Sequence, residues 1–584
     1  MAQETQQRWN IDELMPEGAA ALDGRLARLE ETVAHIEGLR PLLAPQIAPA
    51  DFARLLAALE QYARAASELQ AYGELWFSGD LLDQEAQAFL GRVEQSAADL
   101  GNRVLFFSLW WRALDEENAA RLTAGAGDLR YHLAKERLMS RHTLGEAEEQ
   151  VVNLKDVNGV HALIKVYDLI TNKFSFTLEV DGERKTLTRD ALGAYARHPA
   201  PQIREAAYRE QYRPYGAEAA VLGQIYVNRA RDWAGENLSL RSFGAPIDVR
   251  NLANDIPSEV VDTLLGVCEE QAPIFQRYFQ AKAGWLGIPR LRRFDLYAPV
   301  SGKAERTIPF GEAVDTVMEG FARFSGEAEA LARRVFASQH IDSESRPGKR
   351  GGAFCYSVTP ERDPWVLVNY TGEPREVATL AHELGHALHS LLARGHSVLT
   401  YHAPLPLAET ASVFSEMLLT DLLLERERDP AARRDLIAAK IDDIYATVLR
   451  QAFFVLFERR AHLLATHGAT IDELSAAYLE NLGTQFGDAL EVDEIFRHEW
   501  ITIPHLYHVP FYCYAYSFGM LLSLSLYRRY KQEWASFVPG FLRLLAHGGA
   551  ASPEAILVEA GVDMRDPDFW RGGFRVVEEM IAQL

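Results

Sequence analysis

Apolar residues recur along most of this chain at intervals of three and four positions, the spacing of one face of an α-helix. Residues 1–115 are rich in Ala, Leu, Glu and Arg and carry one such stripe, at Leu22, Leu26, Leu29 and Val33. The helical pattern continues to about residue 173 and dominates again after residue 200. We therefore expect a mainly α protein, with strand content well below the usual level of about 20–25%.

Short stretches interrupt this pattern and predict strands. Alternating apolar residues from Phe174 to Val180 precede Asp181-Gly182, a sequence typical of a β-hairpin with a tight turn. Residues 353–357 and 365–370 predict two strands of a small sheet directly before the helix described next. An edge of that sheet could pair with an extended peptide backbone, or the strands could serve only as a scaffold.

Residues 379–390 read Thr-Leu-Ala-His-Glu-Leu-Gly-His-Ala-Leu-His-Ser and contain the motif H-E-x-x-H. On a helix, His382 and His386 lie on one face and present two imidazoles to a common point. Two imidazoles from adjacent turns are a common half-site for zinc. Glu383 lies about 100° around the helix, where it can stand beside the metal as the general base for a water. The motif therefore predicts a catalytic zinc site.

The alternative is a chance match, since the chain contains 17 His in 584 residues. Signals for a helix favour the metal site. Pro374 falls near the expected first turn, Glu373 and Glu376 fall at its positive end, and Gly395 follows its end. Leucines at three- and four-residue spacing bury one side of the same helix.

A catalytic zinc needs a third protein ligand and an open position for water. After a proline-rich turn, Glu409 and Glu416 lie at the start of another expected helix. They are seven positions apart and share a face, so either could bind the metal while the other holds a histidine by its free N–H. His389, one turn after His386, could bind the metal, support a ligand or pack in the core, and the last two are favoured.

Composition narrows the function classes. The chain has 60 basic and 82 acidic residues, a net charge of −22, which disfavours binding to nucleic acid or to anionic membranes. Three cysteines far apart in sequence form no disulfide framework, and the first residues contain no apolar signal core, so we expect a cytoplasmic location. Residues 506–527 lack charged side chains but include His508, Pro510 and several tyrosines. They predict a buried helix lining a polar cavity rather than a membrane span.

A second cluster of polar and aromatic side chains lies within residues 504–519. Hydrolysis of a peptide bond creates an oxyanion at the carbonyl, which Tyr O–H and His N–H groups can stabilise. Tyr512 and Tyr516 are four positions apart and would project from one helical face. The alternative for this cluster is aromatic packing in the core. The metal motif favours oxyanion donors for some of its members.

These stretches resemble the M3 family of zinc metallopeptidases, in particular its oligoendopeptidase F branch. The resemblance rests on residues 379–390, on Glu409-Thr-Ala-Ser-Val-Phe-Ser-Glu416, on the run from Pro504 to Tyr516, and on the opening Trp9-Asn-Ile-Asp-Glu-Leu-Met-Pro16. It covers the chain nearly end to end. Its combination of motifs is far more specific than H-E-x-x-H alone.

The resemblance implies one zinc ion held by His382, His386 and Glu409, with Glu383 as general base and proton shuttle. It implies oxyanion donors from His505, Tyr512 and Tyr516. The implied fold is a helical clamshell with a deep channel that admits short unfolded peptides and excludes folded proteins. The expected regions are an N-terminal helical region at 1–115, an oligopeptidase F-type domain with the hairpin at 116–200, and a catalytic domain at 201–584.

The expected function is zinc-dependent hydrolysis of internal bonds in short, unfolded oligopeptides. One alternative is a zinc carboxypeptidase on the same scaffold, which would need a basic group for the free carboxylate, such as Arg497 or Arg350. Another is a peptide-binding protein without turnover, which would not require the intact Glu383.

Overall fold

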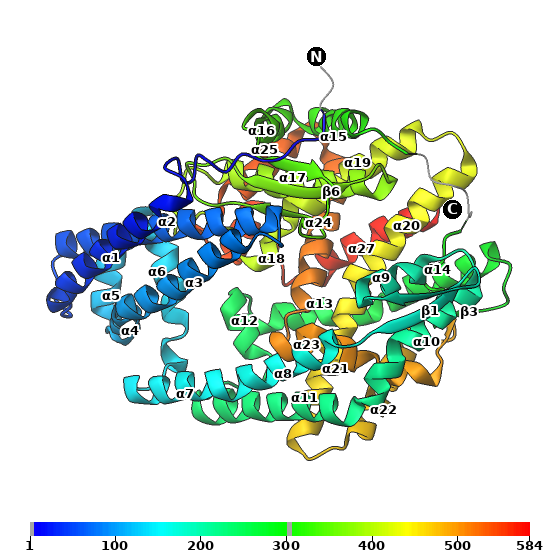
Figure 1. Ribbon diagram of the computed structural model, residues 1–584, viewed down its shortest axis with the longest axis horizontal. Helices are drawn as coiled ribbons and strands as arrows, with labels where there is room; N and C mark the ends of the chain where they lie inside the picture. Colours follow the sequence, from blue (N-terminus) through cyan, green and yellow to red (C-terminus); the bar gives the residue numbers. More distant parts are fainter. Residues whose placement is uncertain (1–4, 301–306) are drawn as a thin grey trace. The chain divides into compact units, whose positions relative to one another are not determined.

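Helices make up most of the chain in the computed structural model, which describes residues 5–300 and 307–584 (Figure 1). The predicted mainly α architecture is confirmed. The chain divides into two units, each built from separate stretches of sequence. The first contains the described residues of 1–140, 305–423 and 529–562, and the second those of 141–304, 424–528 and 563–584. The predicted division into three consecutive regions stays a prediction.

The first unit is built mainly from helices around one small sheet. Its helices, with α19 included because most of it lies here, are α1 (Leu22–Leu39), α2 (Pro49–Gly79), α3 (Gln84–Val104), α4 (Phe106–Ala113), α5 (Glu116–Thr123), α6 (Arg130–Leu138), α15 (Phe310–Phe324), α16 (Gly326–Ala337), α17 (Pro374–Leu392), α18 (Leu405–Ala408), α19 (Thr410–Arg426), α25 (Val538–Ala546) and α26 (Pro553–Glu559).

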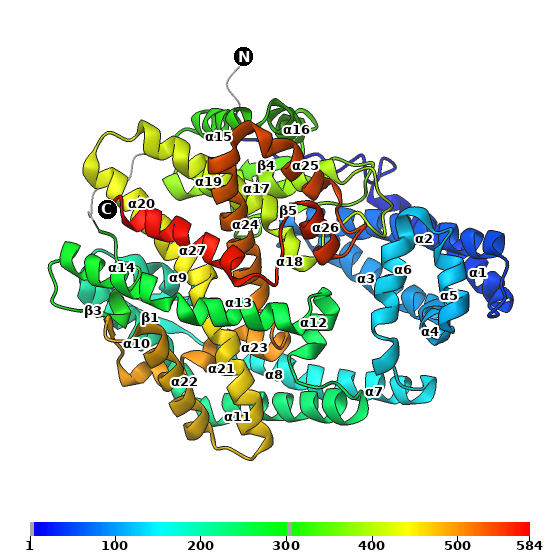
Figure 2. The ribbon, with the colours of Figure 1, turned by 180° about the vertical axis from the view of Figure 1, so that it is seen from behind.

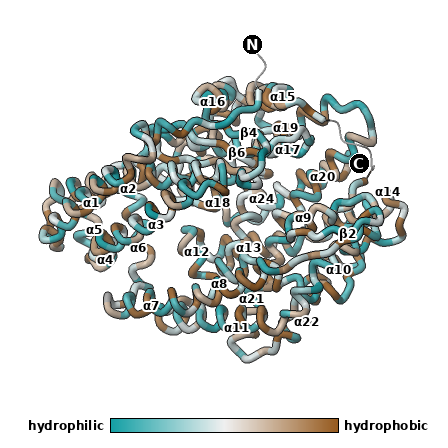
Figure 3. Tube along the Cα trace, viewed as in Figure 1, coloured by the Kyte–Doolittle hydropathy of each residue, from teal (hydrophilic) through white to brown (hydrophobic). Residues whose placement is uncertain are grey.

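Helices α1, α2 and α3 pack together because each has an apolar face, visible as the alternation of polar and apolar positions along them (Figure 3). The predicted stripe is confirmed: Leu22, Leu29 and Val33 are buried and Leu26 packs against the same core. Trp365, on the central strand of the sheet, belongs to this core as well. Trp365 therefore attaches the sheet to the core of α1, α2 and α3.

The sheet of the first unit has the order β4-β6-β5, from β4 (Ile341–Glu344), β5 (Phe354–Tyr356) and β6 (Trp365–Tyr370). The two predicted strands, β5 and β6, are confirmed, and they pair antiparallel with Cys355 opposite Val366. Strand β4, which the pattern did not predict, pairs parallel to β6. β6 is apolar on both faces because it lies in the centre of the sheet and contacts α17.

The second unit contains the remaining helices, several of which lie side by side in Figure 2, such as α11, α21 and α22. Its helices, with α24 included because most of it lies here, are α7 (Glu146–Asn158), α8 (Val160–Asn172), α9 (Arg189–Ala194), α10 (Pro201–Ala217), α11 (Ala219–Trp233), α12 (Asp248–Asn254), α13 (Ser258–Glu270), α14 (Ala272–Trp285), α20 (Pro430–Thr447), α21 (Leu449–Thr466), α22 (Ile471–Phe486), α23 (Pro504–His508), α24 (Tyr514–Glu533) and α27 (Pro567–Ile581).

Two short sheets complete the second unit. The predicted hairpin is confirmed as β1 (Phe176–Val180) paired antiparallel with β2 (Glu183–Leu187). Asp181 and Gly182 both have positive φ, at 54° and 80°, as the tight hairpin turn requires. The other sheet joins β3 (Leu291–Arg292) in parallel to β7 (Leu490–Glu491).

Residues 506–527 form α23, a turn and most of α24. In the parts of the chain that the structure describes, no helix has both the length and the apolar character needed to cross a membrane. The predicted burial of this helix is confirmed: its serines are buried and their hydroxyls donate to backbone carbonyls, as Ser517 does to Val448 at 2.8 Å. The polar cavity that it was expected to line stays a prediction.

Candidate metal centre

The metal-binding motif lies on α17, whose first turn is fixed by a dense set of hydrogen bonds. Glu373 is the N-cap, Pro374 opens the helix, and the Glu376 carboxylate accepts hydrogen bonds from the backbone N–H groups of Thr371, Gly372 and Glu373. The helix extends to Leu392, before Gly395. The predicted helix is therefore confirmed with the expected signals at both ends.

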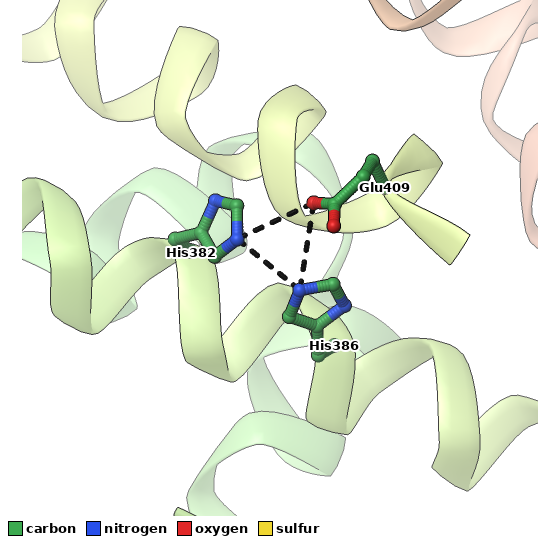
Figure 4. Close-up of side chains that lie close together, drawn as sticks. All are labelled: His382, His386 and Glu409. Atoms are coloured by element: carbon green, nitrogen blue, oxygen red, sulfur yellow. Dashed lines mark hydrogen bonds and ion pairs between the residues drawn. The ribbon is translucent and has the colours of Figure 1, made fainter. Parts of the chain in front are cut away.

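His382 and His386 project from adjacent turns of α17 towards the same point, with their rings perpendicular and 4.8 Å apart (Figure 4). Their Nε2 atoms lie 3.1 Å apart, and Glu409 Oε2 lies 3.4 Å from the first and 3.5 Å from the second. In a tetrahedral site with bonds of about 2.0–2.1 Å, ligand atoms lie about 3.3–3.4 Å from one another. The triangle of these three atoms therefore has the dimensions of a zinc site with an open fourth position.

Glu409 reaches this point because α19 approaches α17 closely at a glycine. A Cβ atom on Gly385 would lie only 2.6 Å from Ser412 Cα and 2.7 Å from the Ala411 carbonyl oxygen. The Ser412 hydroxyl donates to Glu409 Oε2 at 2.8 Å and holds the carboxylate in place. Gly385 and Ser412 were not singled out from the sequence, although glycine inside a helix is a signal of close packing.

Glu416 contacts the opposite side of the His382 ring, with 2.5 Å between its Oε1 and His382 Nδ1. This contact fixes the ring orientation and leaves Nε2 facing His386 and Glu409. The two glutamates that spacing alone left open thus occupy different places. Glu409 lies with the two Nε2 atoms, and Glu416 lies behind one of them.

The charges of this cluster perturb the protonation of both histidines. Burial lowers the pKa of His382, but the hydrogen bond and charge of Glu416, together with Glu409, raise it to about 9. Burial lowers the pKa of His386 to about 4, although Glu409 opposes the shift. A divalent cation would replace the proton that the carboxylates favour on His382. The chemistry of the donor set therefore fits a metal.

Glu383 is almost fully buried beside the cluster, with 6% of its surface exposed. Burial raises the pKa of its carboxyl to about 7, although the charge of His382 and a hydrogen bond from the Cys355 backbone lower it. A carboxyl that titrates near neutral pH can both accept and return a proton. The Cys355 contact also ties β5 to this side chain, a link that the sequence did not reveal.

The metal cluster opens into a cavity of about 530 Å³ within the first unit. Its wall includes residues 353–357, which contain β5 at one edge of the small sheet, as well as Glu383, His389 and Tyr401. His389 is buried, and burial lowers its pKa to about 4, so it is neutral. It lies outside the triangle of donor atoms formed by His382, His386 and Glu409.

The second predicted set, His505, Tyr512 and Tyr516, lies in the second unit, where the three rings contact one another. The His505 and Tyr512 rings are parallel with centroids 5.6 Å apart, and Tyr516 lies edge-on to both. The Tyr516 hydroxyl is 3.3 Å from His505 Nε2. All three are half-buried, whereas Tyr507 and Tyr514 nearby are buried.

The buried tyrosines of this segment have structural partners. The Tyr507 hydroxyl donates to the Leu222 carbonyl at 3.3 Å, and the Tyr514 hydroxyl accepts from Asn254 at 2.9 Å. Aromatic core packing thus describes Tyr507 and Tyr514. His508 is exposed and pairs with Asp168 at 2.8 Å.

The two arginines considered for a carboxypeptidase have other contacts. Arg350 is exposed, lies over the Phe354 ring, and is not among the described residues that line the cavity. Arg497 forms ion pairs with Asp472 and Glu494 in the second unit.

Known proteins resemble this chain in sequence. The family model described as Peptidase family M3 matches residues 194–576. The chromosomal oligoendopeptidase F of Lactococcus lactis subsp. cremoris is 26% identical over 423 residues, which cover 72% of this chain and 70% of the relative. An oligoendopeptidase F homolog of Lactococcus lactis subsp. lactis is 26% identical over 462 residues, which cover 77% and 75%.

Solved structures share the fold. Oligoendopeptidase F from Enterococcus faecium matches with a TM-score of 0.71 and 22% identity over 98% of both chains. A candidate peptidase from Chlamydophila abortus matches with a TM-score of 0.87 and 23% identity, covering 99% of this chain and 97% of the other. The predicted fold class and the predicted family resemblance are both confirmed.

Proposed function

The chain belongs to peptidase family M3 and is a metalloendopeptidase, and we propose that it uses one zinc ion to hydrolyse internal bonds of short, unfolded oligopeptides. The observation that carries this proposal is the triangle of His382 Nε2, His386 Nε2 and Glu409 Oε2, with sides of 3.1–3.5 Å. Its dimensions and its N/N/O donors suit zinc, with a fourth position left for substrate or water.

His382, His386 and Glu409 would hold the zinc. When bound, the ion supplies Lewis-acid polarisation of the scissile carbonyl and activation of a water molecule. Glu416 keeps His382 oriented through its Nδ1. Ser412 does the same for Glu409. These two supports keep the three donor atoms at the spacing that the ion requires.

Glu383 is the proposed general base. Its carboxylate takes a proton from the attacking water and passes it to the leaving amine nitrogen as the peptide bond breaks. The raised pKa of about 7 suits both steps, because the carboxylate is basic enough to accept the proton and acidic enough to return it. The hydrogen bond from the Cys355 backbone fixes its position.

His505, Tyr512 and Tyr516 are the proposed oxyanion donors. They would donate hydrogen bonds to the carbonyl oxygen as it gains negative charge. Their half-buried side chains support this role, because a half-buried polar atom can reach a substrate, whereas Tyr507 and Tyr514 beside them are buried in the core. Burial lowers the pKa of His505, so its ring is neutral at pH 7 and carries one N–H to donate.

The substrate would lie as an extended chain along β5. This strand is at the edge of its sheet and lines the cavity that contains the metal cluster. The names of the Lactococcus lactis relatives, oligoendopeptidases, support short peptides as the substrate class. The cytoplasmic location stays a prediction.

The experiment is a metal analysis combined with cleavage of quenched-fluorescent peptides blocked at both ends. We expect one zinc per chain, internal cleavage of the blocked peptides, and loss of both zinc and activity with a chelator. Full activity after complete removal of metal would overturn the zinc proposal. Cleavage that required a free C-terminal carboxylate would favour the carboxypeptidase. Zinc binding without any turnover would favour the peptide-binding protein.

A further inference from the structure

The turn between α23 and α24 contains an unusual backbone conformation. Phe511 has a φ of 59°, in the left-handed region that a residue with a side chain rarely adopts. Among the described non-glycine residues with positive φ, it is the only one that is fully buried. Neighbouring contacts must therefore hold this conformation in place.

The main contact is with Glu458, a fully buried residue of α21. The Phe511 backbone N–H donates a hydrogen bond of 2.9 Å to Glu458 Oε1. The Phe511 ring packs on the ring of His462, one turn further along α21, with centroids 4.7 Å apart. Arg250 supports the same turn by donating to the Pro510 carbonyl at 3.3 Å.

The residue after Phe511 is Tyr512, so the direction of its side chain depends on the φ of the turn. The Tyr512 N–H donates to the Val509 carbonyl at 3.1 Å, and its own carbonyl accepts from Ala515 at 3.0 Å, at the first turn of α24. That turn carries Tyr516. A change at Phe511 would therefore rotate Tyr512 and displace the beginning of the helix that bears Tyr516.

Besides the hydrogen bond from Phe511, the Glu458 carboxyl interacts with the charges of Arg250 and Arg229. Its second oxygen, Oε2, has no hydrogen-bond partner among the residues that the structure describes. The other oxygen, Oε1, lies 3.8 Å from His462 Nε2, but burial lowers the pKa of that imidazole to about 3, so the histidine carries no charge to pair with it. A buried carboxyl is costly, and its single well-formed hydrogen bond goes to the turn.

Either form of the carboxyl can accept that bond. Burial raises the pKa of Glu458 to about 8, so the side chain is largely protonated at neutral pH while one oxygen still accepts from Phe511. Glutamine has the same shape and the same acceptor, which makes it the conservative replacement.

We propose that Glu458 is a positioning residue for catalysis, which holds the left-handed turn at Phe511 so that Tyr512 and Tyr516 keep their arrangement beside His505. This inference rests on the proposed function, in which the two hydroxyls stabilise the oxyanion. Glu458 is not among the described residues that line the cavity at the metal cluster, and it acts on the turn through the backbone N–H of Phe511.

The test compares Glu458→Met with Glu458→Gln. Methionine keeps the length of the side chain and removes the oxygen acceptor. We expect Glu458→Met to lower kcat about 100-fold, the size of effect expected from misplacing catalytic groups by about 1 Å, with KM and zinc content close to those of the parent protein. Glu458→Gln should retain most of the activity, because its amide oxygen accepts the same hydrogen bond.

A double-mutant cycle separates positioning from a general structural effect. In a Tyr512→Phe/Tyr516→Phe background, the hydroxyls are already absent, so Glu458→Met should cost less than about threefold in kcat. Equal losses in both backgrounds would overturn the inference, and so would a loss with Glu458→Gln as large as with Glu458→Met. If Glu458→Met does not fold, as judged by circular dichroism, Glu458→Leu takes its place in the same cycle.

The outcomes also separate this inference from the proposed function. If Tyr512→Phe and Tyr516→Phe leave kcat unchanged, the oxyanion role itself is wrong. If those variants are slow while Glu458→Met is as fast as the parent protein, only the role of Glu458 is wrong.

Discussion

The side chains of the metal cluster and those of the second cluster, His505, Tyr512 and Tyr516, are held in position by different means. His382 and His386 are four positions apart on a regular helix, so the helical period places both rings on one face, and the Glu416 contact turns His382 Nε2 towards His386, 3.1 Å from its Nε2. His505 lies on α23 and Tyr516 on α24, whereas Tyr512 lies in the irregular turn between them, next to the left-handed Phe511. The prediction that Tyr512 and Tyr516 project from one helical face is therefore wrong, because α24 begins only at Tyr514.

Regular structure places the two histidines, with Glu416 and Ser412 as supports in the metal cluster, whereas contacts in an irregular turn place Tyr512. The position of the two histidines should therefore depend less on distant contacts than the position of Tyr512.

The largest expected effect comes from removing a proposed metal ligand. His386→Ala deletes one corner of the triangle, and the two remaining donors cannot hold zinc tightly enough for catalysis. We expect the purified variant to contain no zinc and to show no measurable peptide cleavage. Metal content by plasma mass spectrometry and turnover of a quenched peptide check this. A variant that kept full zinc and activity would contradict the ligand assignment.

Glu383→Gln separates catalysis from metal binding within the same helix. Glutamine cannot accept the proton, so kcat should fall at least about 100-fold, the low end of a general-base contribution. Zinc content should stay at the parent level, because Glu383 lies outside the triangle. Metal content and peptide turnover, measured for both Glu383→Gln and His386→Ala, test this prediction. Unchanged turnover in Glu383→Gln would remove the base from the mechanism.

Tyr512→Phe removes one proposed oxyanion donor from the second cluster. Loss of one oxyanion donor should lower kcat about 100-fold at unchanged zinc content. Tyr507→Phe is the matched control, because it removes a hydroxyl that donates to the Leu222 carbonyl. It should reduce the free energy of unfolding by about 0.5–1.5 kcal/mol and leave kcat unchanged. Equal losses of kcat in Tyr512→Phe and Tyr507→Phe would mean that either change disturbs the packing of the whole segment, and would contradict a specific role for the Tyr512 hydroxyl.

Gly385→Ala tests the close approach that brings Glu409 to the metal. The added Cβ would meet Ser412 Cα at 2.6 Å, so α19 must shift away. We expect the free energy of unfolding to fall by about 1–3 kcal/mol and zinc affinity to weaken. Gly91→Ala on α3 is the control, because its Cβ would meet nothing within 4 Å and should stabilise the helix. Thermal unfolding and competition with a chelator report both effects.

The sequence predicted those features that local rules decide. The period of a helix predicted the pairing of His382 with His386, and Asp181-Gly182 predicted the hairpin. The spacing did not decide which of Glu409 and Glu416 binds the metal, because residues seven apart share a helical face. In the structure, the close approach of α19 to α17 at Gly385 distinguishes the two. The resemblance supplied the choice that spacing could not.

Strand β4 was missed because Asp342 within it is polar, yet buried. Arg346 and Lys349 pair with its carboxylate at 2.6 and 2.8 Å and make this burial possible. The turn at Phe511 was missed as well, because no glycine or asparagine marks its positive φ. Both depend on partners distant from the local pattern.

The spacing of the donor triangle has a consequence for which cations the protein can use. Calcium prefers six to eight oxygens at about 2.3–2.6 Å, and magnesium prefers an octahedron of oxygens, so a compact set of two nitrogens and one oxygen excludes both. Cobalt and manganese accept imidazole and carboxylate donors at comparable distances. Geometry alone therefore admits several first-row ions besides zinc, so the supply of metal in the cell acts together with the shape of the site in selecting the ion.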